Sequence, residues 1–151
     1  MILKKRTTEK LGEILVRQGI ISEQQLRQAL ETQKSEKGLL GEILIRLGYV
    51  NEREIAQAII SQYGFPFLPL ENYDFNLEAA KLVPENVARQ YRVVPLDIIG
   101  DILIVAMSNP LNRSAIEDIE MITGKKVKAF IAVITSINEA LRKIYEKEDD
   151  K

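Results

Sequence analysis

The sequence of 151 residues contains no cysteine, no histidine and no tryptophan. Without cysteine it cannot form disulfide bridges, a thiolate nucleophile or a cysteine-ligated metal site. Without histidine it lacks the usual general base and the commonest zinc ligand. Most hydrolase and metalloenzyme mechanisms are therefore excluded. We expect a protein that is not an enzyme and that holds no metal or cofactor of its own.

An excess of charge of one sign is also absent. The chain carries 21 basic and 22 acidic side chains, which gives a formal net charge of −1. Such a chain is a poor candidate for binding a nucleic-acid polymer or a membrane surface. Hydrophobic residues make up 46% of the sequence, which is typical of a folded, core-forming protein. The length predicts one domain or two small subdomains.

Long apolar runs are missing as well. No stretch approaches the roughly 20 apolar residues that a membrane span requires. The first ten residues, MILKKRTTEK, carry positive charge, but no apolar run of signal-peptide length follows them. The sequence therefore predicts a cytoplasmic protein without direct membrane insertion.

What the sequence does contain is a tandem repeat. Residues 10–33, KLGEILVRQGIISEQQLRQALETQ, align with residues 39–62, LLGEILIRLGYVNEREIAQAIISQ, and 11 of the 24 positions are identical. A spacer of five residues, KSEKG, separates the two copies. Each copy ends in a glutamine, Gln33 or Gln62. Such a repeat predicts one structural unit that is built twice.

Each copy is expected to form two helices joined by a sharp corner. Ser22 with Gln25, and Asn51 with Glu54, have the spacing of capping boxes at the start of the second helix. Apolar residues then recur at helical spacing. In the two second helices these residues are Leu26, Ala29 and Leu30, and Ile55, Ala58 and Ile59. The simplest interpretation is a small helical bundle whose repeats pack on each other.

Glycines mark two positions in each copy. Gly19 and Gly48 follow the first helices, where a left-handed residue ends a helix at little cost. Gly12 and Gly41 fall inside the first turn, where glycine costs roughly 0.5–1 kcal/mol relative to alanine. We therefore expect a close approach to the backbone there, either by a neighbouring helix or by a ligand such as a phosphate. Residues 1–62 carry 10 basic and 8 acidic side chains, net +2, and the rest 11 and 14, net −3, which also suits an anion on the repeats.

The second half is expected to be a small mixed α/β subdomain. A glycine and two prolines break the helical period within residues 63–73, which we take as a junction between residues 1–62 and residues 74–151. Beyond it the pattern predicts two helices, at Leu77 to Leu82 and Pro84 to Tyr91, and then two strands, at Val93 to Ile98 and Ile102 to Met107. A helix is expected at Asn112 to Thr123, with Ile116, Ile119 and Ile122 on one face, followed by a third strand at Val127 to Val133. A last helix is expected to run from its N-cap Thr135 to Lys147, before a solvated tail. The predicted fold class is therefore α+β, with a helical tandem repeat followed by a β-β-α-β-α unit.

No catalytic constellation is visible in this half. Ser108 and Ser114 have no imidazole in the chain to activate them. Glu117, Asp118 and Glu120 fall on a predicted helix and are expected to form its solvated face. The pattern of a phosphate-binding loop is absent too.

Several phrases of the sequence, in their order, are similar to one known family. They are the paired LGEIL repeats, YGFPFLPL, LVPENVARQYRVVPL, ILIVAMSNPLN and INEALRKIYEK. Over nearly its whole length the chain resembles the N-terminal domain of the assembly ATPases of type II secretion systems and type IV pili. The resemblance implies two protein partners, the hexameric ATPase motor domain and the inner-membrane platform. It also implies a cytoplasmic location that is peripheral to the inner membrane through those partners.

The resemblance further implies two roles for the domain. In one, the domain docks the motor onto the inner-membrane platform through protein contacts. In the other, it binds the second messenger cyclic di-GMP along two 24-residue motifs with a five-residue spacer, and the repeat here has that length and that spacer. We expect a regulatory and docking domain that binds cyclic di-GMP. The alternative is a docking module that binds no nucleotide.

The family motif implies twelve ligand-binding residues. They are Lys10, Leu11, Gly12, Leu26, Leu30 and Gln33 in the first copy, and Leu39, Leu40, Gly41, Ile55, Ile59 and Gln62 in the second. The family has arginine at the first motif position, where this sequence has Lys10 and Leu39. Arginine offers a planar fork for a guanine edge or a phosphate, whereas lysine offers one point charge and leucine only apolar contact. We therefore expect a weakened contact in the first copy and a lost one in the second.

Overall fold

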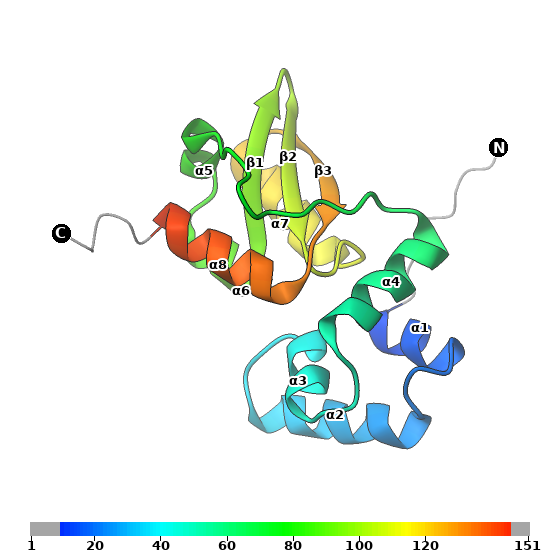
Figure 1. Cartoon of the computed structure of the whole chain (residues 1–151). Helices are drawn as coiled ribbons and strands as arrows, with labels where there is room; N and C mark the ends of the chain where they lie inside the picture. Colours follow the sequence, from blue (N-terminus) through cyan, green and yellow to red (C-terminus); the bar gives the residue numbers. More distant parts are fainter. Residues whose placement is uncertain (1–9, 146–151) are drawn as a thin grey trace. The chain divides into compact units, whose positions relative to one another are not determined.

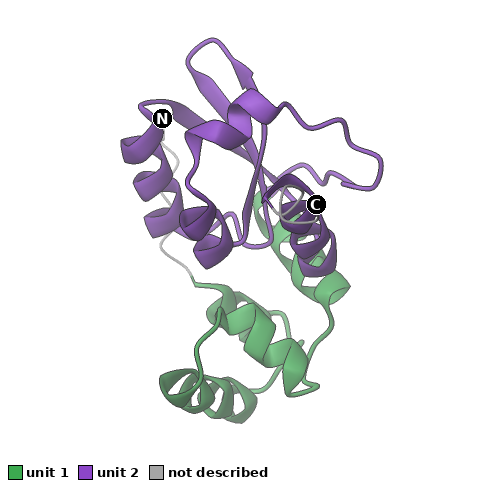
Figure 2. Cartoon of the chain, turned by 90° about the vertical axis from the view of Figure 1, so that its left-hand side faces the viewer, with its two compact units in different colours: residues 1–63 green, residues 64–151 purple. Residues whose placement is uncertain are grey.

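The computed structural model describes residues 10–145 of the chain and contains eight helices and three strands within them. The chain divides into two compact units, Met1–Tyr63 and Gly64–Lys151, which Figure 2 colours separately. The first unit is helical, and the second combines helices with a sheet (Figure 1). The predicted α+β fold class is confirmed.

The first unit consists of two helix pairs, one from each copy of the repeat. The helices are α1 (Leu11–Arg17), α2 (Glu23–Ser35), α3 (Leu40–Arg46) and α4 (Glu52–Tyr63). Helix α2 packs on α3, and α1 packs on α4. Ile14 and Leu15 of α1 and the equivalent Ile43 and Leu44 of α3 have no exposed surface. The same positions of both copies therefore build one shared core.

The corners of the repeat form as the sequence predicts. Ser22 Oγ accepts a hydrogen bond from the Gln25 backbone N–H at 3.0 Å, and Gln25 Oε1 accepts one from the Ser22 N–H at 2.9 Å. Asn51 Oδ1 and Glu54 Oε1 make the same reciprocal pair, at 2.8 and 2.9 Å. These bonds satisfy N–H groups that have no partner inside the helices. Gly19, like its counterpart in the second copy, has a positive φ, here 77°.

The second unit contains a three-stranded sheet. Its elements are α5 (Leu77–Leu82), α6 (Glu85–Tyr91), β1 (Val93–Ile99), β2 (Ile102–Met107), α7 (Arg113–Thr123), β3 (Lys126–Ile131) and α8 (Ile134–Tyr145). Strand β2 is central, antiparallel to β1 and parallel to β3. Helix α7 packs on β3, while α5, α6 and α8 pack on β1 (Figure 1). The predicted β-β-α-β-α order is confirmed.

Three details of this unit differ from the predictions. Strand β3 ends at Ile131 and not at Val133, because its partner β2 ends at Met107, opposite Ile131. Helix α8 begins at Ile134, so Thr135 lies within the helix and is not its N-cap. Ile122, which was expected on the apolar face of α7, is 47% exposed. The buried stripe of this helix is formed by Ala115 and Ile119, and Ile122 lies at the margin of that stripe. The predicted helix end at Lys147 and the tail beyond it lie outside the described residues.

The segment after the first unit is attached to the outer edge of the sheet. The Leu68 N–H donates to the Ile131 carbonyl at 3.0 Å, and the Ile131 N–H donates to the Pro66 carbonyl at 2.9 Å. Farther along the same edge, the Val127 N–H donates to Glu120 Oε2 at 2.9 Å. Both ends of this edge strand are thereby hydrogen-bonded to other parts of the unit.

None of the helices within residues 10–145 is long and apolar enough to cross a membrane.

Tyr145 provides a test of the packing between α8 and the α5–α6 corner. Its hydroxyl donates to the Val83 carbonyl at 3.0 Å, and burial raises the pKa of Tyr145 to about 12. The folded state therefore favours the neutral phenol, so this contribution to stability is complete below about pH 10 and is lost as the pH rises towards 12. We expect Tyr145→Phe to lower the free energy of unfolding by about 1 kcal/mol at neutral pH.

Chemical denaturation of both proteins between neutral pH and pH 12 measures this contribution. The difference between wild type and variant is expected to shrink over the last two pH units. A difference that is constant with pH would contradict the assignment. Tyr49→Phe, in the other unit, serves as the control for general effects of alkali.

The boundary between the units predicts where proteases act first. Residues 66–68 are hydrogen-bonded to β3, and Leu70 is buried. We therefore expect chymotrypsin to cleave first after Tyr63, at the end of α4, before it cleaves in the repeats, because proteases favour chain outside packed elements. Mass spectrometry of the earliest fragments identifies the site. First cuts inside α1–α4 would indicate that the helical unit is the less stable part.

Candidate functional site

The starts of both repeats meet at Gly12. A Cβ atom added to Gly12 would lie 2.5 Å from Leu26 Cδ1 and 3.3 Å from Leu40 Cδ2. The missing side chain thus lets α2 and α3 approach the first turn of α1. Of the two alternatives that the sequence left open for this glycine, the structure shows the neighbouring helix. Gly41, its equivalent in the second copy, is buried as well.

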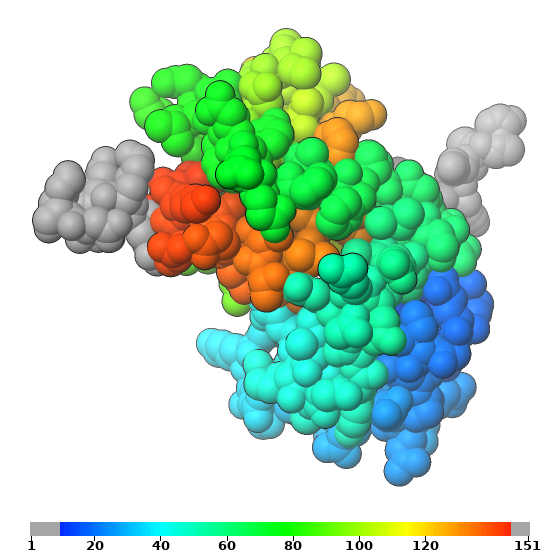
Figure 3. Space-filling view, in the orientation of Figure 1, coloured from blue at the N-terminus to red at the C-terminus, as the bar shows by residue number. Residues whose placement is uncertain are grey.

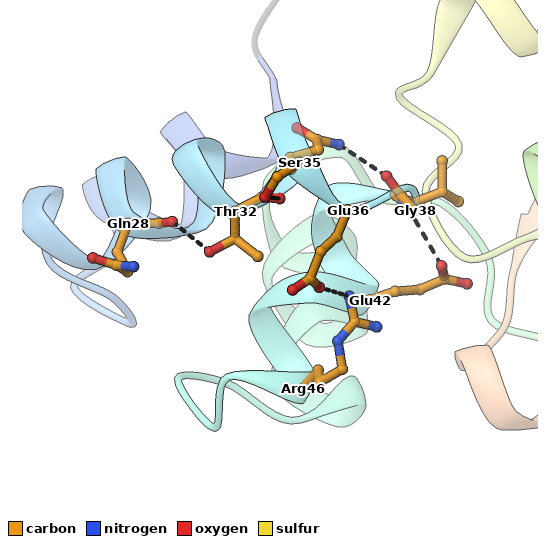
Figure 4. A network of polar contacts seen from close by, with 9 residues as sticks. Gln28, Thr32, Ser35, Glu36, Gly38, Glu42 and Arg46 are labelled. Atoms are coloured by element: carbon orange, nitrogen blue, oxygen red, sulfur yellow. Dashed lines mark hydrogen bonds and ion pairs between the residues drawn. The ribbon is translucent and has the colours of Figure 1, made fainter.

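The spacer brings the end of the first motif to the start of the second. Gln33 Nε2 donates to the Gly38 carbonyl at 3.1 Å, and the Leu39 N–H donates to Glu42 Oε1 at 3.4 Å. Glu36 in the spacer pairs with Arg46 of α3 at 3.0 Å, as Figure 4 shows. The first two contacts fix the turn that leads into α3, and the ion pair ties the spacer to the last residue of α3.

The end of the second motif has a different partner. Gln62 Oε1 accepts a hydrogen bond from Arg17 Nη1 at 3.0 Å, and Gln18 Nε2 donates to the Ala58 carbonyl at 3.3 Å. Both bonds join the end of α1 to α4. Sequence reasoning missed Arg17 as a residue of this region. The sequence feature that could have indicated Arg17 is that both copies of the repeat have arginine at this position, Arg17 and Arg46.

The apolar residues implied by the motif divide into two groups. Leu30 is 42% exposed, and Leu26 and Leu40 are half-buried, so these three can contact a ligand. The other three, Leu11, Ile55 and Ile59, are 4%, 3% and 0% exposed and belong to the core of the helical unit. For these three residues a ligand contact stays a prediction, because their side chains pack in the core while α2 presents Leu30 to solvent.

The remaining candidates lie at the surface or at its margin. Lys10 is exposed, and its backbone N–H donates to Glu13 Oε1 at 3.1 Å. Gln62 is exposed, while Gln33 and Leu39 are half-buried. The space-filling view shows side chains from α2, the spacer and α3, in blue to cyan, on the surface of the helical unit (Figure 3). The accessible part of the motif therefore combines amides, one lysine and leucine side chains.

The second unit contains no comparable collection of motif residues. A cavity of about 310 Å³ lies between α8 and the segment that follows Leu70, and its lining includes Phe75 and Lys143. None of the twelve expected ligand-binding residues lines it. Within residues 10–145 no three acidic, cysteine or histidine side chains cluster in a way that could hold a metal ion.

The acidic residues of α7 have structural partners. Glu117 pairs with Arg113 at 3.2 Å, and Glu120 accepts from the Val127 N–H. Asp118 accepts a hydrogen bond from the Tyr91 hydroxyl, and this bond raises the pKa of Tyr91 above its usual range. The exposed ion pair fits the predicted solvated face of the helix, and the other two contacts tie α7 to its neighbours.

Comparison with known proteins gives the class of this domain. Residues 63–151 match the model of the MshEN domain. The solved structure of MshE with cyclic di-GMP superposes with a TM-score of 0.66 at 32% identity and covers 91% of this chain and 99% of that chain. The N-terminal domain of XpsE superposes with a TM-score of 0.72 at 18% identity, over 95% and 99% of the two chains, and shows the same fold.

The curated relatives in sequence are longer proteins that contain a similar segment. The type IV pilus assembly ATPase PilB of Myxococcus xanthus is 37% identical over 139 residues, which are 92% of this chain and 25% of PilB. PilB of Thermus thermophilus is 30% identical over 139 residues, which are 91% of this chain and 16% of that protein. The chain belongs to the MshEN domain family, the N-terminal domain of type IV pilus assembly ATPases. It spans a quarter or less of the length of these relatives.

Gly12 provides a test of the junction between the repeats. In Gly12→Val the new side chain must displace both Leu26 and Leu40. Overpacking of this kind costs about 1–3 kcal/mol, so we expect the free energy of unfolding to fall by that amount, as measured by chemical denaturation followed by circular dichroism. Gln24→Val, which introduces the same residue at an exposed position of α2, is the control. Equal effects of the two substitutions would contradict the close packing at Gly12.

Proposed function

We propose that this chain is the regulatory and docking domain of a pilus or secretion assembly ATPase, and that its helical unit binds cyclic di-GMP. The main support is the likeness to MshE, whose solved structure contains this nucleotide and whose chain is matched over 99% of its length at 32% identity. The domain itself performs no catalysis in this proposal. ATP hydrolysis belongs to the motor part of the ATPase.

The accessible residues of the two motifs suit a guanine nucleotide. Leu26, Leu30 and Leu40 offer apolar surface for the faces of a base, and the Gln33 and Gln62 side chains offer amide groups for its hydrogen-bonding edges. Both ends of the first motif lie next to the beginning of the second. We propose that Leu11, Ile55 and Ile59 hold the helices in place, since they are buried.

The first motif position sets the strength of binding. Lys10 is exposed and keeps one positive charge there, but Leu39 can make only apolar contact. A good bidentate contact from arginine to a base is worth about 1–3 kcal/mol. We therefore propose an affinity about tenfold to a hundredfold below that of a site with arginine at both positions.

A docking module without a nucleotide is the second candidate, and exposed apolar residues of the second unit favour it. Met121 is 80% exposed, Ile99 58% and Ile122 47%. The turn that joins β1 to β2, next to Ile99, protrudes from its unit (Figures 1 and 3). Exposed apolar side chains become buried when they contact a partner protein, which is the support for this candidate. In this reading the partner is the inner-membrane platform and the repeats are purely structural.

Isothermal titration calorimetry with cyclic di-GMP separates the two candidates. We expect micromolar or tighter binding, about −8 kcal/mol or more favourable, and far weaker binding of GTP and linear pGpG. Lys10→Ala should weaken binding by about tenfold, because it removes a charge-assisted contact. Leu39→Arg should strengthen it by a similar factor.

Two control variants match these substitutions. Lys81→Ala removes an exposed lysine of the other unit, and Leu47→Arg places the same new charge at another half-buried leucine. Neither should change the affinity. If the wild type gives no heat at high micromolar concentration while Leu39→Arg binds, the site has been lost in this chain and the docking candidate is favoured.

A further inference from the structure

The second unit has a cavity that none of the motif residues lines. Its volume is about 310 Å³, and it lies between α8 and the segment that follows Leu70, drawn in orange and green in Figure 3. Ligand pockets in proteins begin at roughly 300 Å³, so this cavity has room for one large side chain. Five of its nine lining residues are exposed, namely Glu71, Asn72, Thr135, Glu139 and Lys143. The cavity is therefore open to solvent, and a side chain can enter it while it remains attached to a larger molecule.

One wall of the cavity is a closed turn. The Tyr73 N–H donates to the Leu70 carbonyl at 3.1 Å. Asn72, at the corner of this turn, has a positive φ of 66°, a conformation that asparagine tolerates better than most residues. Ser136 of α8 donates through Oγ to Glu71 Oε2 at 3.2 Å. The turn and the helix, which form the two walls of the cavity, are thus joined by a hydrogen bond.

The charges around the cavity favour a cation. Glu71 comes from the turn and Glu139 from α8, while Lys143 is the one basic side chain of the lining. The hydrogen bond from Arg142 holds the pKa of Glu139 below its usual range, so this carboxylate is ionised at neutral pH. A carboxylate offers about four lone pairs, and both glutamates can therefore accept further hydrogen bonds from a ligand.

An aromatic ring and an apolar floor complete the cavity. Phe75 belongs to the lining, and the Tyr73 ring lies beside it, with 5.3 Å between the ring centroids and 52° between the ring planes. Leu70 and Ala140, which are 4% and 3% exposed, supply the apolar part of the lining. The face of a phenyl ring attracts a cation, and an apolar surface suits the methylene stem of a long cationic side chain.

We propose that this cavity binds the side chain of an arginine that a partner protein presents. The guanidinium donates to Glu71 and Glu139 and stacks on Phe75, and the stem covers Leu70 and Ala140. A guanidinium suits the cavity better than an ammonium, because it is planar, has five donors and stacks on aromatic rings. This inference adds a docking contact to the proposed function, and it does not depend on nucleotide binding by the helical unit.

Titration followed by nuclear magnetic resonance tests the choice of arginine on the whole chain. The probes are three capped tripeptides: acetyl-Gly-Arg-Gly-amide, the same peptide with lysine, and the same peptide with citrulline, the neutral isostere of arginine. We expect the arginine peptide to shift the backbone amide signals of Asn72, Phe75 and Ser136 and to bind at least about threefold more tightly than the lysine peptide. The citrulline peptide should not bind. Equal binding of the arginine and citrulline peptides, or shifts confined to other parts of the chain, would overturn the inference.

Matched substitutions test the charges that line the cavity. Glu71→Gln and Glu139→Gln should each weaken binding of the arginine peptide about threefold, because each removes one charged acceptor. Lys143→Gln should strengthen it about twofold, because it removes a charge that repels the ligand. Glu78→Gln, which changes an exposed carboxylate of α5 outside the cavity, is the control and should have no effect. Weaker binding in Lys143→Gln, or a loss in Glu78→Gln equal to that in Glu71→Gln, would contradict the assignment.

The titration with cyclic di-GMP separates this inference from the proposed nucleotide binding. If the chain binds the nucleotide but not the arginine peptide, the inference is wrong and the nucleotide proposal stands. If the chain binds the arginine peptide as described but not the nucleotide, the docking contact stands by itself.

Discussion

The absence of a side chain at Gly12 is the constraint on which the helical unit depends. It allows Leu26 and Leu40, from two different helices, to reach the first turn of α1. Because α1 meets both α2 and α3 there, the beginnings of the two motifs lie side by side. The spacer then carries the end of the first motif to the same place, where Gln33 bonds to Gly38. One missing methyl group thus organises most of the accessible motif residues.

Two copies of one sequence motif do not make two equal surfaces. Leu30 of α2 is 42% exposed, whereas its equivalent Ile59 of α4 is fully buried. The two helices have different neighbours, since α4 packs against α1 while α2 contacts mainly α3. The polar ends of the motifs differ for the same reason, because only the second glutamine lies within reach of Arg17. Symmetry in the sequence is therefore broken by the tertiary structure.

The sequence predicted what local interactions decide. Capping boxes, helix-ending glycines and apolar periodicity depend on residues within one turn of each other, and Ser22 and Asn51 form the expected bonds. The details that were wrong depend on partners far along the chain. The end of β3 is set by the last residue of β2, and the exposure of Ile122 is set by which face of α7 is buried against the rest of the unit. The contact between Arg17 and Gln62 spans 45 positions, so no pattern within one helix could indicate it.

The edges of the sheet determine how the second unit can associate with other molecules. On β1, the Leu96 carbonyl accepts from the Asn76 N–H. On β3, the backbone is occupied near both ends by Glu120 and by residues 66–68, and Lys126 and Lys128 are exposed along the strand. Open edges invite strand-by-strand association between copies, which leads to aggregation, and flanking lysines oppose it. These features of both edges oppose pairing of the sheet with the sheet of a second copy.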